Sequence, residues 1–414
     1  MLASEATTQS LPNGWKHRTL GELGESIIGL TFSPSQVSSH GTLVLRSSNI
    51  QNGRLDLADC VHVAADIPAK LRVQPDDILI CARNGSRDLI GKCLLLDSRV
   101  KGMSFGAFMA VYRSPLNWYV IYQLQAEPIR GQVRSHLGAT INQITSGSLQ
   151  GFTIPVPDDE HEQRAIAAAL SDADALIAAL ERLIAKKRDI KQGAMQELLT
   201  GRRRLPGFEG AWETRRLGEL GRFSKGRGIK RDQVTGEGLP CIRYGELYTK
   251  YENYTYAPES RIPPGVAATA LKIEPGAILF AGSGETAVEI GRCVAYLGLE
   301  PAYAGGDIVV LTPRGQDSLY LAHLLNHPSI ASQKARFGQG DAVVHIHAKH
   351  LEKIEVTTPE LAEQAAIATI LTDMDAEITA LEARLTKARD IKQGMMQQLL
   401  TGRIRLHAVQ GESQ

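Results

Sequence analysis

Side chains that can grip a nucleic acid gather in several short polar stretches of this chain. Arginine, lysine, asparagine and glutamine hold phosphates and make paired hydrogen bonds to base edges. In the first half of the chain the candidates are Arg46, Ser48, Asn49, Arg83, Asn84, Arg87, Arg130, Arg134, Asn142 and Gln143. In the second half they are Lys225, Arg227, Lys230, Arg231, Arg243, Tyr244, Lys334, Arg336, Gln339 and His345. For any one of them taken alone, a solvated surface charge is the simpler interpretation, so the prediction rests on the clusters.

One stretch resembles a cofactor loop. Phe280–Glu285 (FAGSGE) has the F-x-G-x-G pattern with which methyltransferases hold S-adenosylmethionine. Such a loop should follow a strand and open a helix, whereas Gly291 would interrupt that helix after one or two turns. The sequence therefore predicts a turn between strands. A GxxxxGK[S/T] phosphate loop and an N/D-P-P-Y/F motif are both missing, so we expect a non-catalytic chain that holds no cofactor.

Metal binding and an oxidising compartment are not expected either. Alternation would put His345 and His347 on one strand face, but no carboxylate or cysteine completes a ligand set. Five cysteines without a CxxC pair suit reduced thiols. The net charge of +1 gives no sign of a basic tail, and no apolar run approaches the roughly 18 residues that span a bilayer. We expect a cytoplasmic protein with no membrane contact.

The elements that position these residues follow from an internal repeat. Residues 162–205 and 363–406 are nearly the same sequence, and both contain D-I-K-Q-G and L-L-T-G-R. A period of about 200 residues is far longer than a solenoid or propeller unit, so each copy should end a whole domain. The chain is therefore expected to consist of two similar halves.

Each copy carries a helical seam of apolar residues at 4-3-4-3 spacing. The seam positions are Ile166, Leu170, Ala173, Ile177, Leu180 and Ile184 in the first copy, and Ile367, Leu371, Met374, Ile378, Leu381, Leu385 and Ala388 in the second. Gly201 and Gly402 would close the two helices. Glycine inside a helix costs about 1 kcal/mol relative to alanine, so its recurrence at Gly193 and Gly394 indicates close packing or a kink there.

A rod of about 40 residues, roughly 60 Å long, cannot bury its seam alone. The simplest partner for each rod is the other copy, and a two-fold axis perpendicular to the rods would make the pair antiparallel. The alternative is that each helix packs back on its own domain.

The regions ahead of the helices align more weakly. Residues 15–24 match residues 212–221, and short apolar runs punctuated by Gly, Pro, Asn and Asp predict strands joined by turns. Each region should be an α+β domain. Arg46 and Arg243 occupy equivalent places, which indicates either a shared phosphate contact or a shared structural ion pair.

Taken together, these motifs resemble the specificity (S) subunit of type I restriction-modification systems. The resemblance implies two similar α/β target recognition domains joined by two long antiparallel coiled-coil helices with pseudo-two-fold symmetry. From the repeat we expect the first domain at 1–157, the first spacer helix at 158–204, the second domain at 205–357, the second spacer helix at 358–406 and a disordered tail at 407–414.

The resemblance also implies partners and a function. The two domains would recognise the halves of a bipartite, asymmetric site on double-stranded DNA. The helices would set the spacer and dock two methyltransferase (M) subunits, and two motor-nuclease (R) subunits would join in a restricting complex. S-adenosylmethionine, ATP and Mg would then be held by the partners. The alternatives are a structural adaptor with two protein-binding domains on a coiled coil, and a stand-alone methyltransferase that uses the Phe280 loop.

Overall fold

The structure is a computed structural model that describes residues 11–137, 142–340 and 343–406. The chain divides into two compact units, one made of Met1–Glu181 with Arg384–Gln414 and the other of Arg182–Ala383. Each unit therefore contains one globular domain, the first half of the long helix that follows it, and the second half of the other long helix. The tail predicted at 407–414 lies outside the described residues.

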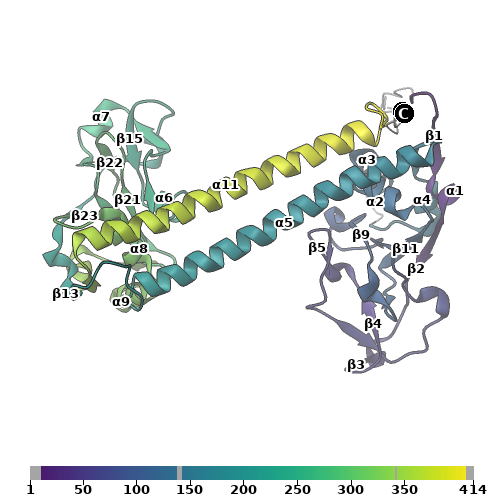
Figure 1. The fold of residues 1–414 in the computed structure, drawn as a ribbon, viewed down its shortest axis with the longest axis horizontal. Helices are drawn as coiled ribbons and strands as arrows, with labels where there is room; N and C mark the ends of the chain where they lie inside the picture. The colour runs from purple at the N-terminus through teal and green to yellow at the C-terminus, as the bar shows by residue number, and fades with distance from the viewer. Residues whose placement is uncertain (1–10, 138–141, 341–342, 407–414) are drawn as a thin grey trace. The chain divides into compact units, whose positions relative to one another are not determined.

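Two long helices run through the units, α5 (Glu160–Leu198) and α11 (Leu361–Leu399), drawn in teal and yellow-green in Figure 1. Each helix has 39 residues, as the unbroken apolar periodicity predicts. Every predicted seam position on both helices is buried or half-buried. No described helix is both long and apolar enough to span a membrane.

Within each unit, the two helix halves run antiparallel. In the ion pairs between them, the residue number on α11 falls as the residue number on α5 rises. These pairs are Asp174 with Lys392 and Glu181 with Arg389 in the first unit, and Lys187 with Glu377 and Lys191 with Asp375 in the second. The antiparallel prediction is confirmed. The alternative, in which each helix packs back on its own domain, also holds for the start of each helix. The first turns of α5 pack into the first domain through Ile166 and Leu170, and those of α11 pack into the second through Ile367 and Leu371.

The first domain is built on a four-stranded antiparallel sheet in the order β2-β11-β8-β9, beside a second sheet in the order β10-β4-β7-β3. Strand β1 pairs with β12 and so joins the start of the domain to the strand that leads into α5. The elements are β1 (Trp15–Thr19), α1 (Leu20–Leu23), β2 (Glu25–Ile28), β3 (Val37–Ser38), β4 (Thr42–Leu45), β5 (Ile50–Gln51), β6 (Arg54–Leu55), β7 (Val61–Val63), β8 (Ile78–Cys81), β9 (Cys93–Leu95), β10 (Ser104–Phe105), β11 (Met109–Arg113), α2 (Asn117–Gln125), α3 (Glu127–His136), α4 (Ser146–Gly151) and β12 (Thr153–Pro157).

The second domain repeats this topology, with sheets in the orders β14-β23-β19-β21-β16 and β17-β15-β22-β18, and with β13 paired to β25. Its short pair β20–β24 has a single bridge as its counterpart in the first domain. The elements are β13 (Glu213–Arg216), β14 (Gly221–Lys225), β15 (Leu239–Ile242), α6 (Glu246–Thr249), β16 (Tyr254–Thr255), β17 (Ser260–Ile262), α7 (Pro264–Ala267), β18 (Leu271–Ile273), β19 (Ile278–Ala281), β20 (Ser283–Gly284), β21 (Cys293–Tyr296), β22 (Ala302–Ala304), β23 (Ile308–Pro313), α8 (Ser318–Asn326), α9 (Pro328–Phe337), β24 (Val344–His345), α10 (Ala348–Leu351) and β25 (Glu355–Thr358).

Each domain core also includes the last turn of the other repeat's helix. Leu399 and Leu400, at the end of α11, lie in the core of the first domain, and Leu198 and Leu199, at the end of α5, lie in the core of the second. The repeated L-L-T-G-R motif therefore anchors a helix end in a domain core. Burying these leucines stabilises the docking by roughly 2 kcal/mol for each side chain.

An ion pair between a partly exposed arginine and a buried glutamate follows each anchor. In the first unit, the Arg405 guanidinium donates to both carboxylate oxygens of Glu162, at 2.5 and 2.7 Å, and lies 5.9 Å from the Trp15 ring centroid. In the second unit, Arg204 makes the same paired bonds to Glu363, at 2.6 and 2.7 Å. We call these two ion pairs the helix-end latches. The repeat of Arg, Glu and Trp therefore has a structural explanation.

Two glycines behave as the sequence predicts and two do not. Gly201 and Gly402 have φ of 68° and 71°, the left-handed conformation expected just beyond a helix. A Cβ at Gly402 would lie 2.7 Å from Pro12 Cγ, so the site is closed to a side chain. Close packing at Gly193 and Gly394 is contradicted, because a Cβ at either position would meet nothing within 4 Å. Both lie inside unbroken helices.

Candidate nucleic-acid interface

Three candidate stretches of the first domain meet at the end of β8. Arg83 forms an isolated bridge with Gln143, which we call the first-domain bridge. Beside it, Arg87 Nε donates to Asn142 Oδ1 at 3.0 Å. Asn84 Nδ2 donates to the Ser47 hydroxyl at 3.3 Å, which brings in the 46–49 segment. Residues far apart in sequence thus form one polar cluster.

An exposed aromatic ring that the sequence reasoning missed lies in this cluster. The side chain of Phe108 is 59% exposed, and the Arg83 guanidinium carbon lies 5.2 Å from its ring centroid. The backbone carbonyl of Phe108 accepts hydrogen bonds from the N–H groups of Ala82 and Arg83, at 3.0 and 2.9 Å. The only sequence signal was an aromatic residue just after Gly106 and just before an apolar strand, a pattern that many strands share.

Arg46 and Asn49 have structural partners. Asn49 is fully buried, and its amide donates to the carbonyls of Asp56 and Asp59 at 2.8 and 2.9 Å. The Arg46 guanidinium pairs with Asp59 at 2.7 Å. Ser48 is half-buried, and its hydroxyl has no hydrogen-bond partner among the described residues. Asn49 is therefore a core residue, which corrects its assignment to the surface set.

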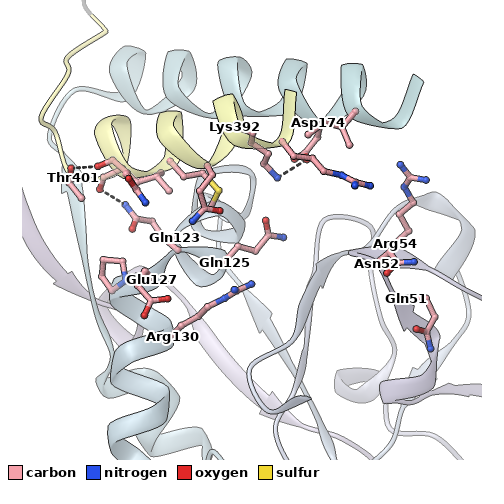
Figure 2. Close-up of a pocket in the computed structure, with 18 of the residues that line it drawn as sticks. Gln51, Asn52, Arg54, Gln123, Gln125, Glu127, Arg130, Asp174, Lys392 and Thr401 are labelled. Atoms are coloured by element: carbon pink, nitrogen blue, oxygen red, sulfur yellow. Dashed lines mark hydrogen bonds and ion pairs between the residues drawn. The ribbon is translucent and has the colours of Figure 1, made fainter. Parts of the chain in front are cut away.

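Arg130 lies on α3 and lines a cleft of about 1180 Å³ within the first unit, while Arg134, on the same helix, lines a neighbouring cleft of about 1090 Å³. Figure 2 shows the first cleft between the β5–β6 hairpin, helices α2 and α3, and the adjoining parts of α5 and α11. Arg54 crosses to α5, where it pairs with Glu181 at 2.6 Å. Arg134 pairs with Glu127. The charges around the cleft are mixed, so it does not form a uniformly basic surface.

The second domain pairs Ser283 with His345 across β20 and β24, a contact we call the second-domain bridge. The Ser283 hydroxyl lies 3.0 Å from His345 Nδ1, and His345 is exposed whereas Ser283 is buried. Gln339 holds the other side of the strand through reciprocal backbone hydrogen bonds with His345 of 3.0 and 2.8 Å. Two of the predicted candidates, Gln339 and His345, therefore lie together.

The two bridges occupy the same place in the repeated fold. The Ile144 N–H donates to the Ala82 carbonyl at 2.7 Å, and the Ile346 N–H donates to the Gly282 carbonyl at 2.9 Å. In both domains, the two residues joined by this hydrogen bond are the immediate sequence neighbours of the two bridge residues. The backbone frame is common to both domains, while the side chains that it carries differ.

A basic segment begins at the last residue of β14 in the second domain. Lys225, Arg227, Lys230 and Arg231 are all exposed, and none forms an ion pair with a described residue. The backbone here is held to a neighbouring segment, because the Arg227 N–H donates to the Ala304 carbonyl at 3.3 Å. These four side chains present net positive charge on a fixed backbone, as a phosphate-binding surface requires.

Arg243 resembles Arg46 in having an acidic partner. Its guanidinium pairs with Glu246 at 3.0 Å, and Glu246 is buried. The Glu246 carboxylate also accepts from the Arg243 backbone N–H at 2.9 Å. The sequence left two interpretations of the equivalent residues Arg46 and Arg243, a shared phosphate contact or a shared structural ion pair. The structure shows an ion pair at both positions. The neighbouring Tyr244 ring is exposed and remains a candidate contact.

Lys334 lies in the core, which corrects its place in the predicted set. Its side chain is 2% exposed, and its amine donates to the Gly291 carbonyl at 2.6 Å. Burial lowers the pKa of this amine, since desolvation disfavours the charged form. Arg336, two residues later on α9, is exposed. A basic residue in a polar stretch is thus not always on the surface.

The F-x-G-x-G stretch lies mostly in strands rather than in the predicted turn. Phe280 and Ala281 end β19, Gly282 separates the two strands, Ser283 and Gly284 form β20, and the described residues 285–292 contain no helix. A strand–loop–helix cradle for a cofactor is therefore missing from this part of the chain. The described residues also bring together no group of three His, Cys, Asp or Glu side chains that could hold a metal ion.

Comparisons with known proteins point to one family. The sequence model of the family described as Type I restriction modification DNA specificity domain matches residues 12–187 and 209–388. The chain is 27% identical over 257 residues to the type I restriction enzyme StySPI specificity subunit of Salmonella potsdam, a match that spans 57% of this chain and only about half (54%) of that protein. It is 25% identical to the putative MjaX specificity subunit of Methanocaldococcus jannaschii, over 96% of this chain and 95% of the relative.

Solved structures show the same fold. An S subunit of a type I restriction-modification system from M. genitalium superposes with a TM-score of 0.60 and 17% identity, over 95% of this chain and 97% of the other. A chain from a study of complex assembly and conformational transition of the type I R-M system gives 0.57 and 18%, over 96% and 100%. The family match covers both domains and most of each long helix. This chain therefore belongs to the family of type I restriction modification DNA specificity domains and carries two copies of that domain.

Proposed function

We propose that this chain is the DNA-recognition subunit of a type I restriction-modification complex. Its two domains contact the two halves of a bipartite, asymmetric site on double-stranded DNA. The long helices dock two methyltransferase subunits and set the unspecified spacer, and two motor-nuclease subunits join in a restricting complex. The complex acts in the cytoplasm.

The observation that carries the proposal is the difference between the two bridges. One backbone frame presents Arg83 and Gln143 in the first domain and Ser283 and His345 in the second. Base edges are distinguished by side-chain donors and acceptors, whereas phosphates look alike at every position. Equivalent places with different polar side chains are what recognition of two different half-sites requires.

The polar surroundings support the same conclusion. Arg87 and Asn142 flank the first bridge, and the exposed basic segment 225–231 belongs to the second domain. Arginine and lysine in such positions neutralise phosphates and fix the register of a domain on a duplex. Catalysis is assigned to the partners, which would hold S-adenosylmethionine, ATP and Mg and would flip the target adenines out of the duplex.

The test is selection from random-sequence duplexes by a gel shift of the chain in complex with its methyltransferase subunits. We expect two short specified stretches with a fixed gap, and affinity that falls steeply with salt because phosphate contacts release counterions. Selection of no sequence would contradict the proposal. Binding that is insensitive to salt would favour the adaptor alternative.

Two reciprocal variants serve as matched controls for the selection. His345→Ala should relax the sequence of one half-site and leave the other unchanged. Gln143→Ala should do the reverse, because the two residues occupy equivalent places in different domains. Relaxation of both half-sites by either variant would mean that the residue acts through folding or partner docking rather than through a base.

A further inference from the structure

The guanidinium of Arg83 has no polar partner among the described residues, unlike its neighbours. Arg46 is paired with Asp59, and Arg87 donates to Asn142. The guanidinium of Arg83 instead lies over the exposed ring of Phe108, at 5.2 Å from the ring centroid. An arginine carries five N–H donors in a planar fork. Here that fork is exposed, and within the described part of the chain nothing polar occupies it.

The backbone on both sides of this stack is fixed. The Arg83 N–H donates to the Phe108 carbonyl at 2.9 Å, and the first-domain bridge holds Arg83 against Gln143. Phe108 directly precedes β11, where Met109 pairs with Cys81. Stacking on an aromatic face restricts the orientation of a guanidinium, so less side-chain entropy is lost when it binds. The pair is thus organised in advance for a planar, two-bond ligand.

Comparison with the second domain indicates what that ligand is. Asp307 stands where Phe108 stands in the first domain, since the Gly282 N–H donates to the Asp307 carbonyl at 2.7 Å as the Ala82 N–H donates to that of Phe108. Ser283 stands in the place of Arg83. Both half-sites offer the same phosphates, so a backbone contact would keep a positive charge in both domains. An exposed carboxylate there would repel a phosphate.

We infer that Arg83, held by Phe108, contacts the O6 and N7 atoms of a guanine in the half-site bound by the first domain. Guanine presents these two acceptors in the major groove, and a bidentate arginine is the commonest specific contact to that base. The inference rests on the proposed function. The second domain lacks both members of the pair, so its half-site is recognised by other side chains.

The experiment uses the full chain with its methyltransferase subunits and the site obtained by selection. Each guanine of that site is replaced in turn by 7-deazaguanine, which lacks the N7 acceptor. For one guanine of one half-site we expect roughly tenfold weaker binding. In Arg83→Ala the same replacement should have almost no further effect. Phe108→Ala should reduce the penalty in part, and Phe108→Tyr, which keeps the ring, should restore it.

Controls separate this result from its alternatives. Arg99→Ala removes an exposed arginine of the same domain that is paired with Asp97, and it should leave every penalty unchanged. In Arg83→Ala, replacing guanines of the other half-site by 7-deazaguanine should still weaken binding as it does for the unsubstituted chain. That result also shows that the variant is correctly folded. If Arg83→Ala instead weakens all sequences equally and lowers the salt slope by about one, Arg83 contacts a phosphate and the inference is overturned.

The two claims fail in different ways. If no bipartite sequence is selected, the proposed function fails. If a bipartite sequence is selected but the penalty at every guanine persists in Arg83→Ala, only the assignment of Arg83 fails. A first half-site without guanine would have the same meaning.

Discussion

At the scale of the residue, burial and partners decide what each polar side chain does. The sequence could place Arg83, Asn84 and Gln143 among the candidates because their types suit base contacts. It could not show that Asn49 and Lys334 are core residues, because burial depends on which segments pack over them. Nor could it show that Phe108 supports Arg83, since that contact joins two loops brought together only by the β8–β11 pairing.

The helix-end latches should contribute measurably to stability. Arg405→Ala leaves the Glu162 carboxylate, which is 2% exposed, with Trp15 Nε1 as its remaining donor, at 3.3 Å. We expect the free energy of unfolding to fall by about 2 kcal/mol, less than for a fully enclosed pair because Arg405 is itself partly exposed. Chemical denaturation of the full chain measures this change.

A surface pair of the same domain is the control for the latch variant. Lys16→Ala removes an exposed ion pair with Asp158 and should cost well under 1 kcal/mol. Equal effects of Lys16→Ala and Arg405→Ala would show that the latch is an ordinary surface ion pair.

His323 should make the second unit sensitive to acid. Burial, with Lys191 nearby, lowers the pKa of His323 from 6.5 to about 4, and neither ring nitrogen has a partner among the described residues. Between those values the unfolded chain binds a proton that the folded chain does not, so stability falls as pH falls from about 6.5 to 4, by about 3 kcal/mol in total.

The substitution that tests this effect is His323→Phe, which keeps a ring beside Tyr254 and removes the titrating group. We expect the slope of unfolding free energy between pH 6.5 and 4 to become shallower, with little change near pH 8. An unchanged slope would assign the acid sensitivity to other groups.

At the scale of the element, the apolar periodicity of the sequence was sufficient to predict the long helices but not to predict which domain each helix end contacts. The 4-3-4-3 seams predict α5 and α11 because a helix buries one stripe, and every seam position is buried or half-buried. The exchange of helix ends between domains could not be predicted. L-L-T-G-R is the same in both copies, so Leu198 and Leu399 carry no signal of which domain core each enters.

Alanine substitutions at glycines inside and just beyond the long helices should change stability in opposite directions. Gly193→Ala and Gly394→Ala should each stabilise the chain by about 1 kcal/mol, because alanine is the better helix former and its methyl group meets no atom. Gly402→Ala should destabilise, since φ is 71° and the methyl group would clash with Pro12. Thermal unfolding of the three variants checks the signs. Destabilisation by the first two would mean that these positions pack more closely than the structure shows.

At the scale of the whole molecule, two copies of one domain alternate with two copies of one helix. The sequence predicts this layout because the repeat is nearly exact in the helices and weaker in the domains. It could not predict the recognised bases, since those depend on loop geometry at positions such as the two bridges. The two helices are alike while the bridge residues differ, as a shared partner and two different half-sites would require.

Helix length should therefore set the spacer. Inserting one heptad into each helix keeps the seam and adds about 10 Å, which corresponds to roughly three base pairs. We expect the selected gap to lengthen by about that amount with both half-sites unchanged. Changed half-sites with an unchanged gap would contradict this role of the helices.

The most direct test of the central claim is a map of methylated adenines in cells that carry this chain and in cells from which it is deleted. The account predicts a bipartite motif with a fixed gap and a methylated adenine in each half, and its loss when the chain is deleted. Substitution of Arg83 should relax one half of that motif only. Methylation that is unchanged by the deletion would contradict the account.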